Sequence, residues 1–195
     1  MREFYERKKR FIERLIREKE RGIVDEPILK LLEEINNSEY FFTLSSCAGR
    51  ITLMKIPENA KKYNCEFIFK THRYVDPKLL WKVLNLKYKE INDPIWFKME
   101  PFIIHIECLD VDHAKKLIEI ARESGLKRSG IFLLNKRIIC EIMSTERIET
   151  IVSKNRKLLI NKRYFFVLVK EANKKLRRTR KKMKKFYDLF KLTFS

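Results

Sequence analysis

The 195-residue sequence contains no glutamine, few glycines, no Cys-x-x-Cys pair and no apolar run close to the ~20 residues that cross a bilayer. It has neither a P-loop nor a Gly-x-Gly-x-x-Gly motif, which disfavours phosphoryl transfer and a Rossmann nucleotide site. The N-terminus lacks the apolar stretch of a signal peptide, so we expect a cytoplasmic protein. Missing glutamine beside abundant Lys, Glu, Arg and Ile is typical of thermophile proteins.

The cysteines are widely spaced, which disfavours both a disulfide framework and a structural zinc site. The pair His105-x-x-Cys108 falls in a predicted strand, where residues three apart face opposite ways, so we expect no metal. Cys47 with His72 or His105 could form a thiol nucleophile, and a Cys47-dependent hydrolase therefore stays an alternative. No sequence spacing positions a base for it.

Positive charge dominates the composition, with 45 Lys and Arg against 26 Asp and Glu and a formal net charge of +19. A solubility-driven surface needs a net charge of only about 2–8, so the excess indicates a polyanionic partner. Residues 171–185 contain nine basic residues and one acid within a helical pattern. Their aromatic neighbours lie on the face expected to pack inward, which favours RNA over lipid. The alternative is that these basic residues only form a solvent-exposed face of the helix and bind no partner.

Periodicity predicts an α+β fold with mostly antiparallel sheets. We expect helices at 1–21, 25–37, 77–84, 112–124 and 162–194, and strands at 40–42, 51–56, 65–75, 95–99, 102–109, 131–134, 138–143 and 147–152. The layout of a helix, a small-residue turn and two strands occurs twice. This repeat indicates one compact domain of two similar, intertwined α/β lobes, at about 25–98 and 99–160. An internal duplication would explain the similarity of the lobes.

Residues 43–50, Thr-Leu-Ser-Ser-Cys-Ala-Gly-Arg, have the composition of a tight turn whose N–H groups and side chains face a ligand. Lys127-Arg-Ser-Gly130 is the corresponding stretch of the second lobe. Glu100 precedes a proline within apolar surroundings, where a carboxylate needs a partner. It could act as a general base, orient an amino group, or form a structural ion pair.

Four blocks resemble one known family. Ser45-Ser-Cys-Ala-Gly-Arg50 is similar to the Ser-Ser-Cys-Ser-Gly-Arg signature of the tRNA wybutosine-synthesising protein 3 family. Lys98-Met-Glu-Pro-Phe-Ile-Ile-His105 and Ser124-Gly-Leu-Lys-Arg-Ser-Gly-Ile131 resemble its Lys-Phe-Glu-Pro-Phe-Ile-Leu-His and Ser-Gly-Phe-Arg-Asn-Ser-Gly-Ile blocks. Ala172-Asn173 matches the family's Ala-Asn. The blocks occur in the family's order.

The resemblance implies an S-adenosylmethionine-dependent methyltransferase that modifies a ring nitrogen, N4, of the 4-demethylwyosine-type base 3′ to the anticodon of tRNA(Phe). Glu100 and His105 would then orient an amino group or accept a proton. The expected cofactor contacts are Ser45, Ser46, Gly49, Arg50, Ser129 and Gly130. The expected tRNA contacts are Arg128, Ser144, Asn173, Lys174, Lys181, Lys182 and Lys185. A non-catalytic tRNA-binding protein is the alternative, and monomer and homodimer are both left open.

Overall fold

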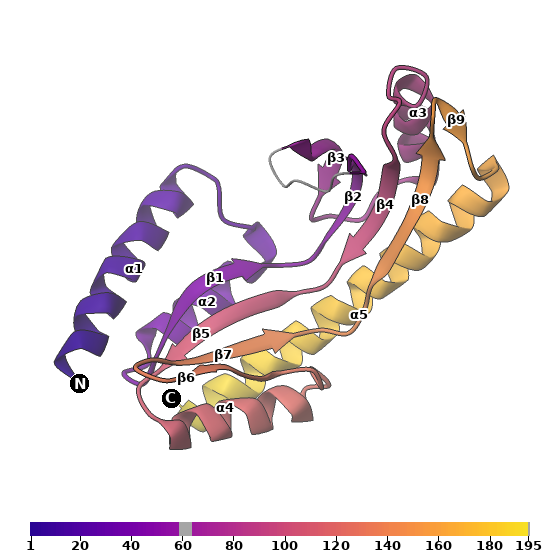
Figure 1. Ribbon diagram of the computed structural model, residues 1–195. Coiled ribbons are helices and arrows are strands. Elements are labelled where there is room, and N and C mark those ends of the chain that lie inside the picture. Colours follow the sequence, from indigo (N-terminus) through magenta and orange to yellow (C-terminus); the bar gives the residue numbers. More distant parts are fainter. Residues whose placement is uncertain (59–63, 195) are drawn as a thin grey trace. The chain divides into compact units, whose positions relative to one another are not determined.

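The computed structural model describes residues 1–58 and 64–194, which form two antiparallel sheets and five α-helices (Figure 1). Its contacts divide the chain into two compact units. Unit 1 comprises Met1–Ala48, Pro101–Thr145 and Thr179–Ser195, and unit 2 comprises Gly49–Glu100 and Glu146–Arg178. The predicted α+β class is confirmed, and nothing in the described residues points to a Rossmann fold. The lobe boundaries at 25–98 and 99–160 stay predictions.

The sheet of unit 1, sheet A, has four strands in the order β1-β5-β7-β6. They are β1 (Phe41–Cys47), β5 (Ile103–Cys108), β7 (Ile138–Met143) and β6 (Gly130–Leu134). The strands predicted at 131–134 and 138–143 are present and pair as a hairpin, which leaves β6 at the edge of the sheet.

Helices cover both faces of sheet A because neighbouring residues of a strand point to opposite sides. Phe41 faces the main core, which the sheet builds with α2 (Leu29–Asn37), α4 (Val111–Glu123) and the end of α5 (Lys162–Phe194). Phe42 faces α1 (Arg2–Glu20), where its ring centroid lies 5.1 Å from that of Phe4. A short 3₁₀ turn, η1 (Glu26–Ile28), leads into α2. Ser45 of β1, His105 of β5 and Glu141 of β7 also lie on this α1-side face.

The sheet of unit 2, sheet B, has the strand order β3-β2-β4-β8-β9. Its strands are β2 (Arg50–Lys55), β3 (Glu66–Thr71), β4 (Ile95–Glu100), β8 (Ile148–Lys154) and β9 (Lys157–Leu158). One face packs on α3 (Pro77–Lys87) and on the first half of α5. Asp76 caps α3, since its carboxylate accepts a hydrogen bond from the Lys78 N–H at 2.7 Å.

The predicted C-terminal helix is confirmed as α5, a single helix of 33 residues. Phe165, Val169 and Leu176 enter the core of unit 2, and Phe186 and Phe190 enter that of unit 1. Successive spacings of four, seven, ten and four residues keep these side chains on one stripe of the helix. Across residues 1–58 and 64–194, no helix combines the length and apolar character of a membrane span.

The tight turn predicted at residues 43–50 is wrong for most of its length. β1 continues through Cys47, and Ser45 and Ser46 pair with His105 and Ile104 of β5. The backbone groups of this stretch therefore bond a neighbouring strand and do not form a ligand-facing turn. Only Ala48 and Gly49 separate β1 from β2, and Gly49 has a φ of +83°, a conformation that favours glycine.

Candidate active site

Three polar side chains form a hydrogen-bonded row across sheet A. The Ser45 hydroxyl lies 3.0 Å from Nδ1 of His105, and Nε2 of His105 lies 3.1 Å from Oε2 of Glu141. The register of the strands explains this row, because Ser45 pairs with His105 and His105 pairs with Glu141. Three directly opposed residues of adjacent strands necessarily share one face of the sheet.

The row orients an imidazole. A carboxylate of Glu141 can only accept, so it binds the N–H form of Nε2 and leaves the Nδ1 lone pair of a neutral His105 toward the Ser45 hydroxyl. Ser45 is exposed, whereas the side chains of His105 and Glu141 are about three-quarters buried. A proton that reaches the exposed hydroxyl therefore has a hydrogen-bonded path to the His105 ring, whose orientation Glu141 fixes.

The predicted strand geometry around His105 is confirmed. His105 lies on the face with Ser45, whereas Cys108 lies in the core, 3.7 Å from the thiol sulfur of Cys140. The hydrogen bond between the two thiols and their burial raise the pKa of Cys108, so this thiol stays protonated. His105-x-x-Cys108 accordingly presents its two side chains on opposite faces of the sheet.

A cavity of about 210 Å³ adjoins this row in unit 1. Ser45 and Ser46 line it together with the charged side chains of Arg14, Glu18 and Asp25. Thr43 and Leu44 of β1 also line it, together with apolar side chains of α1, α2 and the segment between them: Phe11, Leu15, Ile23, Val24 and Leu32. Hydroxyls and charges of both signs beside apolar groups are suited to an amino acid carrying a short apolar chain.

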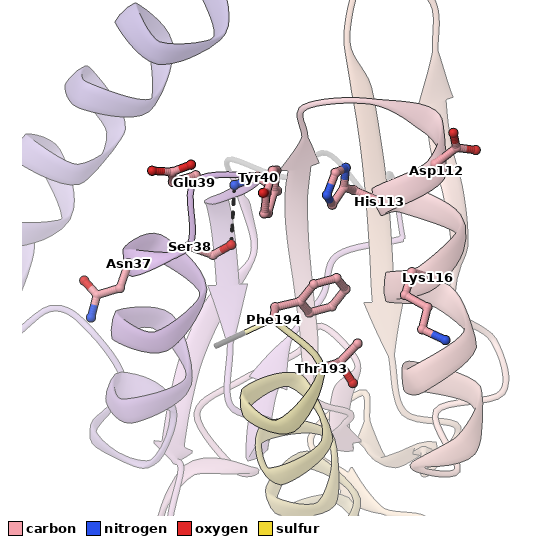
Figure 2. A pocket seen from close by; sticks show the side chains of 9 residues that line it. All are labelled: Asn37, Ser38, Glu39, Tyr40, Asp112, His113, Lys116, Thr193 and Phe194. Atoms are coloured by element: carbon pink, nitrogen blue, oxygen red, sulfur yellow. Dashed lines mark hydrogen bonds between the residues drawn. The ribbon is translucent and has the colours of Figure 1, made fainter.

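A second hollow, of about 710 Å³, opens elsewhere in unit 1, and Figure 2 shows its lining. The rings of Tyr40 and His113 are stacked there, with centroids 3.9 Å apart, and Nδ1 of His113 lies 2.8 Å from Asp110. None of its lining residues is one of the predicted site residues.

In unit 2, Arg50 and Glu100 form an ion pair. They oppose one another on β2 and β4, and the Arg50 Nε donates to the Glu100 carboxylate. The Arg50 guanidinium also lies over the ring of Phe67, 5.0 Å from its centroid. The expectation that the Glu100 carboxylate needs a partner is confirmed, and the partner is Arg50. The role of Glu100 as a base stays a prediction, because its carboxylate is paired with the Arg50 guanidinium in the structure.

The predicted second-lobe residues lie where β6 starts and β7 ends. Ser129 is buried, and its hydroxyl accepts a hydrogen bond from the Met143 N–H at 3.2 Å. The buried Ser144 donates its N–H to the Phe102 carbonyl at 3.0 Å. Gly130 begins β6, and Arg128 is exposed beside it. These contacts join the ends of the strands, and binding roles for the four residues stay predictions.

Several predicted tRNA contacts on α5 also have structural partners. Both polar atoms of the Asn173 amide bond the backbone of Val75, at 2.8 and 3.1 Å. Lys185 donates to the Glu123 carbonyl at the end of α4 at 2.9 Å. The side chain of Lys182 lies beside Gly125, which follows α4 with a φ of +86°. Lys174 faces Glu171 at 3.6 Å, and Lys181 is exposed.

Comparison with known proteins identifies the family. The family described as Methyltransferase TYW3 matches residues 6–192. The chain belongs to this family. It is 36% identical over 166 residues to the tRNA(Phe) 7-((3-amino-3-carboxypropyl)-4-demethylwyosine(37)-N(4))-methyltransferase 1 of Pyrococcus horikoshii, covering 85% of this chain and 83% of that protein. It is 31% identical to the tRNA wybutosine-synthesizing protein 3 homolog of Xenopus laevis, over 86% of this chain and 67% of that protein.

Solved structures agree with this membership in the Methyltransferase TYW3 family. The structure of the PH1069 protein from Pyrococcus horikoshii matches with a TM-score of 0.89 and 31% identity, covering 96% of this chain and 95% of that one. The family resemblance of the four sequence blocks is thereby confirmed. Membership also implies a methyl donor.

Sequence reasoning missed several residues that build the row and its surroundings in this TYW3-family chain. Glu141 fixes the His105 ring, and Phe132 of β6 touches it, with ring centroids 5.2 Å apart. Asp25 accepts from the Ala48 N–H at 2.8 Å, and Arg180 donates to the Ala48 carbonyl, which fixes the end of β1. A glutamate inside the apolar run Ile138–Met143 was the available signal for Glu141.

Proposed function

We propose that this chain methylates ring nitrogen N4 of 7-(3-amino-3-carboxypropyl)-4-demethylwyosine at position 37 of tRNA(Phe), with S-adenosylmethionine as the methyl donor. The family membership and the names of the relatives support the reaction and its substrate. The observation that carries the proposal structurally is the row of Ser45, His105 and Glu141. Two of these residues, Ser45 and His105, belong to the sequence blocks typical of the family.

The reaction requires little covalent chemistry from the protein. When bound, the donor supplies a methyl group on a positively charged sulfur, and the accepting ring loses one N–H proton. We assign removal of this proton to the row: Ser45 accepts it while donating its own hydroxyl proton to Nδ1 of His105. Glu141 stabilises the resulting imidazolium through Nε2. The remaining lowering of the barrier comes from alignment of the two substrates, worth of order 7–11 kcal/mol in favourable cases.

The cavity lined by Ser45 and Ser46 fits part of the donor. Its volume of about 210 Å³ is below the ~300–1,000 Å³ of pockets that bury a whole drug-sized ligand. Arg14 and Glu18 pair with one another at 3.3 Å, and they offer a cation for the donor's carboxylate and an anion for its amino group. Asp25 offers a second anion, for the sulfonium. We therefore place the methionine portion here, with Ser45 next to the reacting group.

The test is methyl transfer from labelled S-adenosylmethionine to tRNA(Phe) carrying the demethylated tricycle, followed by mass analysis of the released nucleoside. We expect His105→Ala to lower kcat by about 10²- to 10⁴-fold, the usual contribution of a general base. Glu141→Gln should lower kcat while leaving tRNA affinity unchanged. Glu119→Gln, on the exposed surface of α4, is the matched control and should retain the native kcat and tRNA affinity.

Calorimetric titration with S-adenosylmethionine distinguishes this function from non-catalytic tRNA binding. The native chain should bind the donor, and Arg14→Met should weaken that binding. A chain that binds tRNA but neither binds the donor nor transfers a methyl group would establish the non-catalytic alternative. Loss of activity in Cys47→Ala would instead favour the Cys47-dependent hydrolase, because the methyltransferase proposed here should mostly survive this substitution.

A further inference from the structure

The edge strand of sheet A exposes an unusual run of apolar side chains. Ile131, Phe132, Leu133 and Leu134 of β6 are all exposed, and Phe132 is 67% exposed. Single exposed apolar residues are ordinary, but four in succession on an edge strand are an interaction surface or an aggregation hazard. A protein that keeps such a run needs a partner for it.

A β-bulge directs Phe132 toward the polar row. The register between β6 and β7 shifts between Ile131 and Leu133, so Phe132 has no directly paired residue on β7. Bulges of this kind redirect one side chain and are frequent beside active sites. The ring of Phe132 reaches that of His105, with an interplanar angle of 69° and a centroid separation of 5.2 Å. The two rings thus meet edge to face, and most of the Phe132 side chain stays exposed to solvent.

The charges around β6 favour a polyanion as the partner. Lys127 and Arg128 precede the strand and Lys136 follows it, and all three are exposed. Antiparallel pairing with β6 of a second copy would bring the basic start of one strand to the basic turn of the other, which is repulsive. Nucleic acid offers phosphates to the flanking cations and flat bases to the phenyl ring. This combination is found in proteins that bind single-stranded nucleic acid.

We propose that Phe132 is the stacking platform for the target base, which lies against the open face of the phenyl ring with its reacting edge toward Ser45 and His105. This inference rests on the proposed function, because it identifies the part of the same site that recognises the tricyclic ring. A fused tricycle offers more stacking area than guanine, so Phe132 also gives the site a preference for tRNA that has already been converted to the tricycle.

The experiment measures the affinity of native and variant chains for two tRNA(Phe) preparations, one with the demethylated tricycle at position 37 and one with guanosine there. Alanine substitution of a stacking aromatic costs about 5- to 150-fold in affinity. We expect Phe132→Ala to lose affinity in this range for tricycle tRNA and to lose the preference over guanosine tRNA. Phe132→Tyr should retain both, and Phe132→Leu, which keeps apolar bulk without a ring, should not.

Leu134→Ala is the matched control, since Leu134 is 60% exposed on the same strand and has no ring. It should leave the preference unchanged. Equal losses in Phe132→Ala and Leu134→Ala, or native affinities in Phe132→Ala, would overturn the inference. So would a native dimer that Phe132→Ala converts to monomer, because the strand would then pair with a second copy. If the native chain fails to methylate tricycle tRNA, the proposed function itself has failed; native methylation with an indifferent Phe132 refutes the stacking platform alone.

Discussion

The buried carboxylate of Glu107 binds α1 to sheet A, and its removal is the first prediction. Its side chain is 1% exposed and binds two arginines from distant parts of the chain. Nε and Nη2 of Arg7 donate to Oε1 at 3.0 and 2.8 Å, and Nε of Arg137 donates to Oε2 at 2.7 Å. One carboxylate thereby fixes both α1 and the turn between β6 and β7. We expect Glu107→Ala to detach these segments and destabilise the fold.

The expected loss of folding stability in Glu107→Ala follows from the burial of the carboxylate. Removing one partner of a buried ion pair costs about 3–5 kcal/mol because the other charge stays unpaired. The side chains of Arg7 and Arg137 are 20% and 33% exposed, so both can partly rehydrate, which favours the lower end, about 3 kcal/mol. At about 2–4 °C per kcal/mol for a chain of this size, Tm should fall by about 6–12 °C.

Urea and thermal unfolding followed by circular dichroism would measure this effect. The matched control is Glu6→Ala, which removes an ion pair on the same helix whose arginine, Arg2, is 93% exposed. Exposed pairs contribute about 0–1 kcal/mol, so this control should unfold almost as the native chain does. Equal stabilities of Glu107→Ala and Glu6→Ala would refute the assignment of a buried, doubly held carboxylate.

Three further predictions concern the basic helix, a buried amide and the thiols. Arg178→Glu with Lys181→Glu, both exposed on α5, should weaken tRNA binding and flatten its salt dependence, whereas unchanged affinity would make this face a merely solvated one. Asn173→Ala should lower the free energy of unfolding by about 1–3 kcal/mol in urea titrations, because two hydrogen bonds to the backbone before α3 are lost; an unchanged midpoint would contradict this. A thiol reagent should label the two partly exposed cysteines and spare Cys108 and Cys140 until the chain unfolds, and rapid labelling of all four would show that the core is open.

Local patterns in the sequence predicted most of the helices and strands. Periodicity predicted α1, α4 and α5, and it predicted the two strands that pair as the β6–β7 hairpin. Each of these depends on contacts between residues near one another in the chain. Alternation also placed His105 and Cys108 on opposite faces, because that follows from strand geometry alone.

The assignment of strands to sheets was not predictable from local patterns. β1 and β2 are separated by only Ala48 and Gly49, yet they belong to different sheets. Small hydroxyl residues before that point resemble a turn in composition, and pairing with β5 overrides this preference. Pairing of β5 with β7 is equally non-local, since α4 and β6 lie between them in sequence. His105 was therefore identified from its sequence block, whereas its partner Glu141 required the register.

Because α5 contributes side chains to both cores, folding during synthesis on the ribosome depends on this last helix. α5 contributes Phe165 and Val169 to one core and Phe186 and Phe190 to the other, and it emerges from the ribosome after every other element. Neither core can be completed while α5 is still inside the ribosomal tunnel, so the earlier strands must wait with apolar surface exposed. Contacts between such distant segments also slow folding. All nine strands that the structure describes precede α5, so a nascent chain stalled before this helix already contains every strand partner. Such a chain should nevertheless bind chaperones, because both cores still lack the apolar side chains of α5.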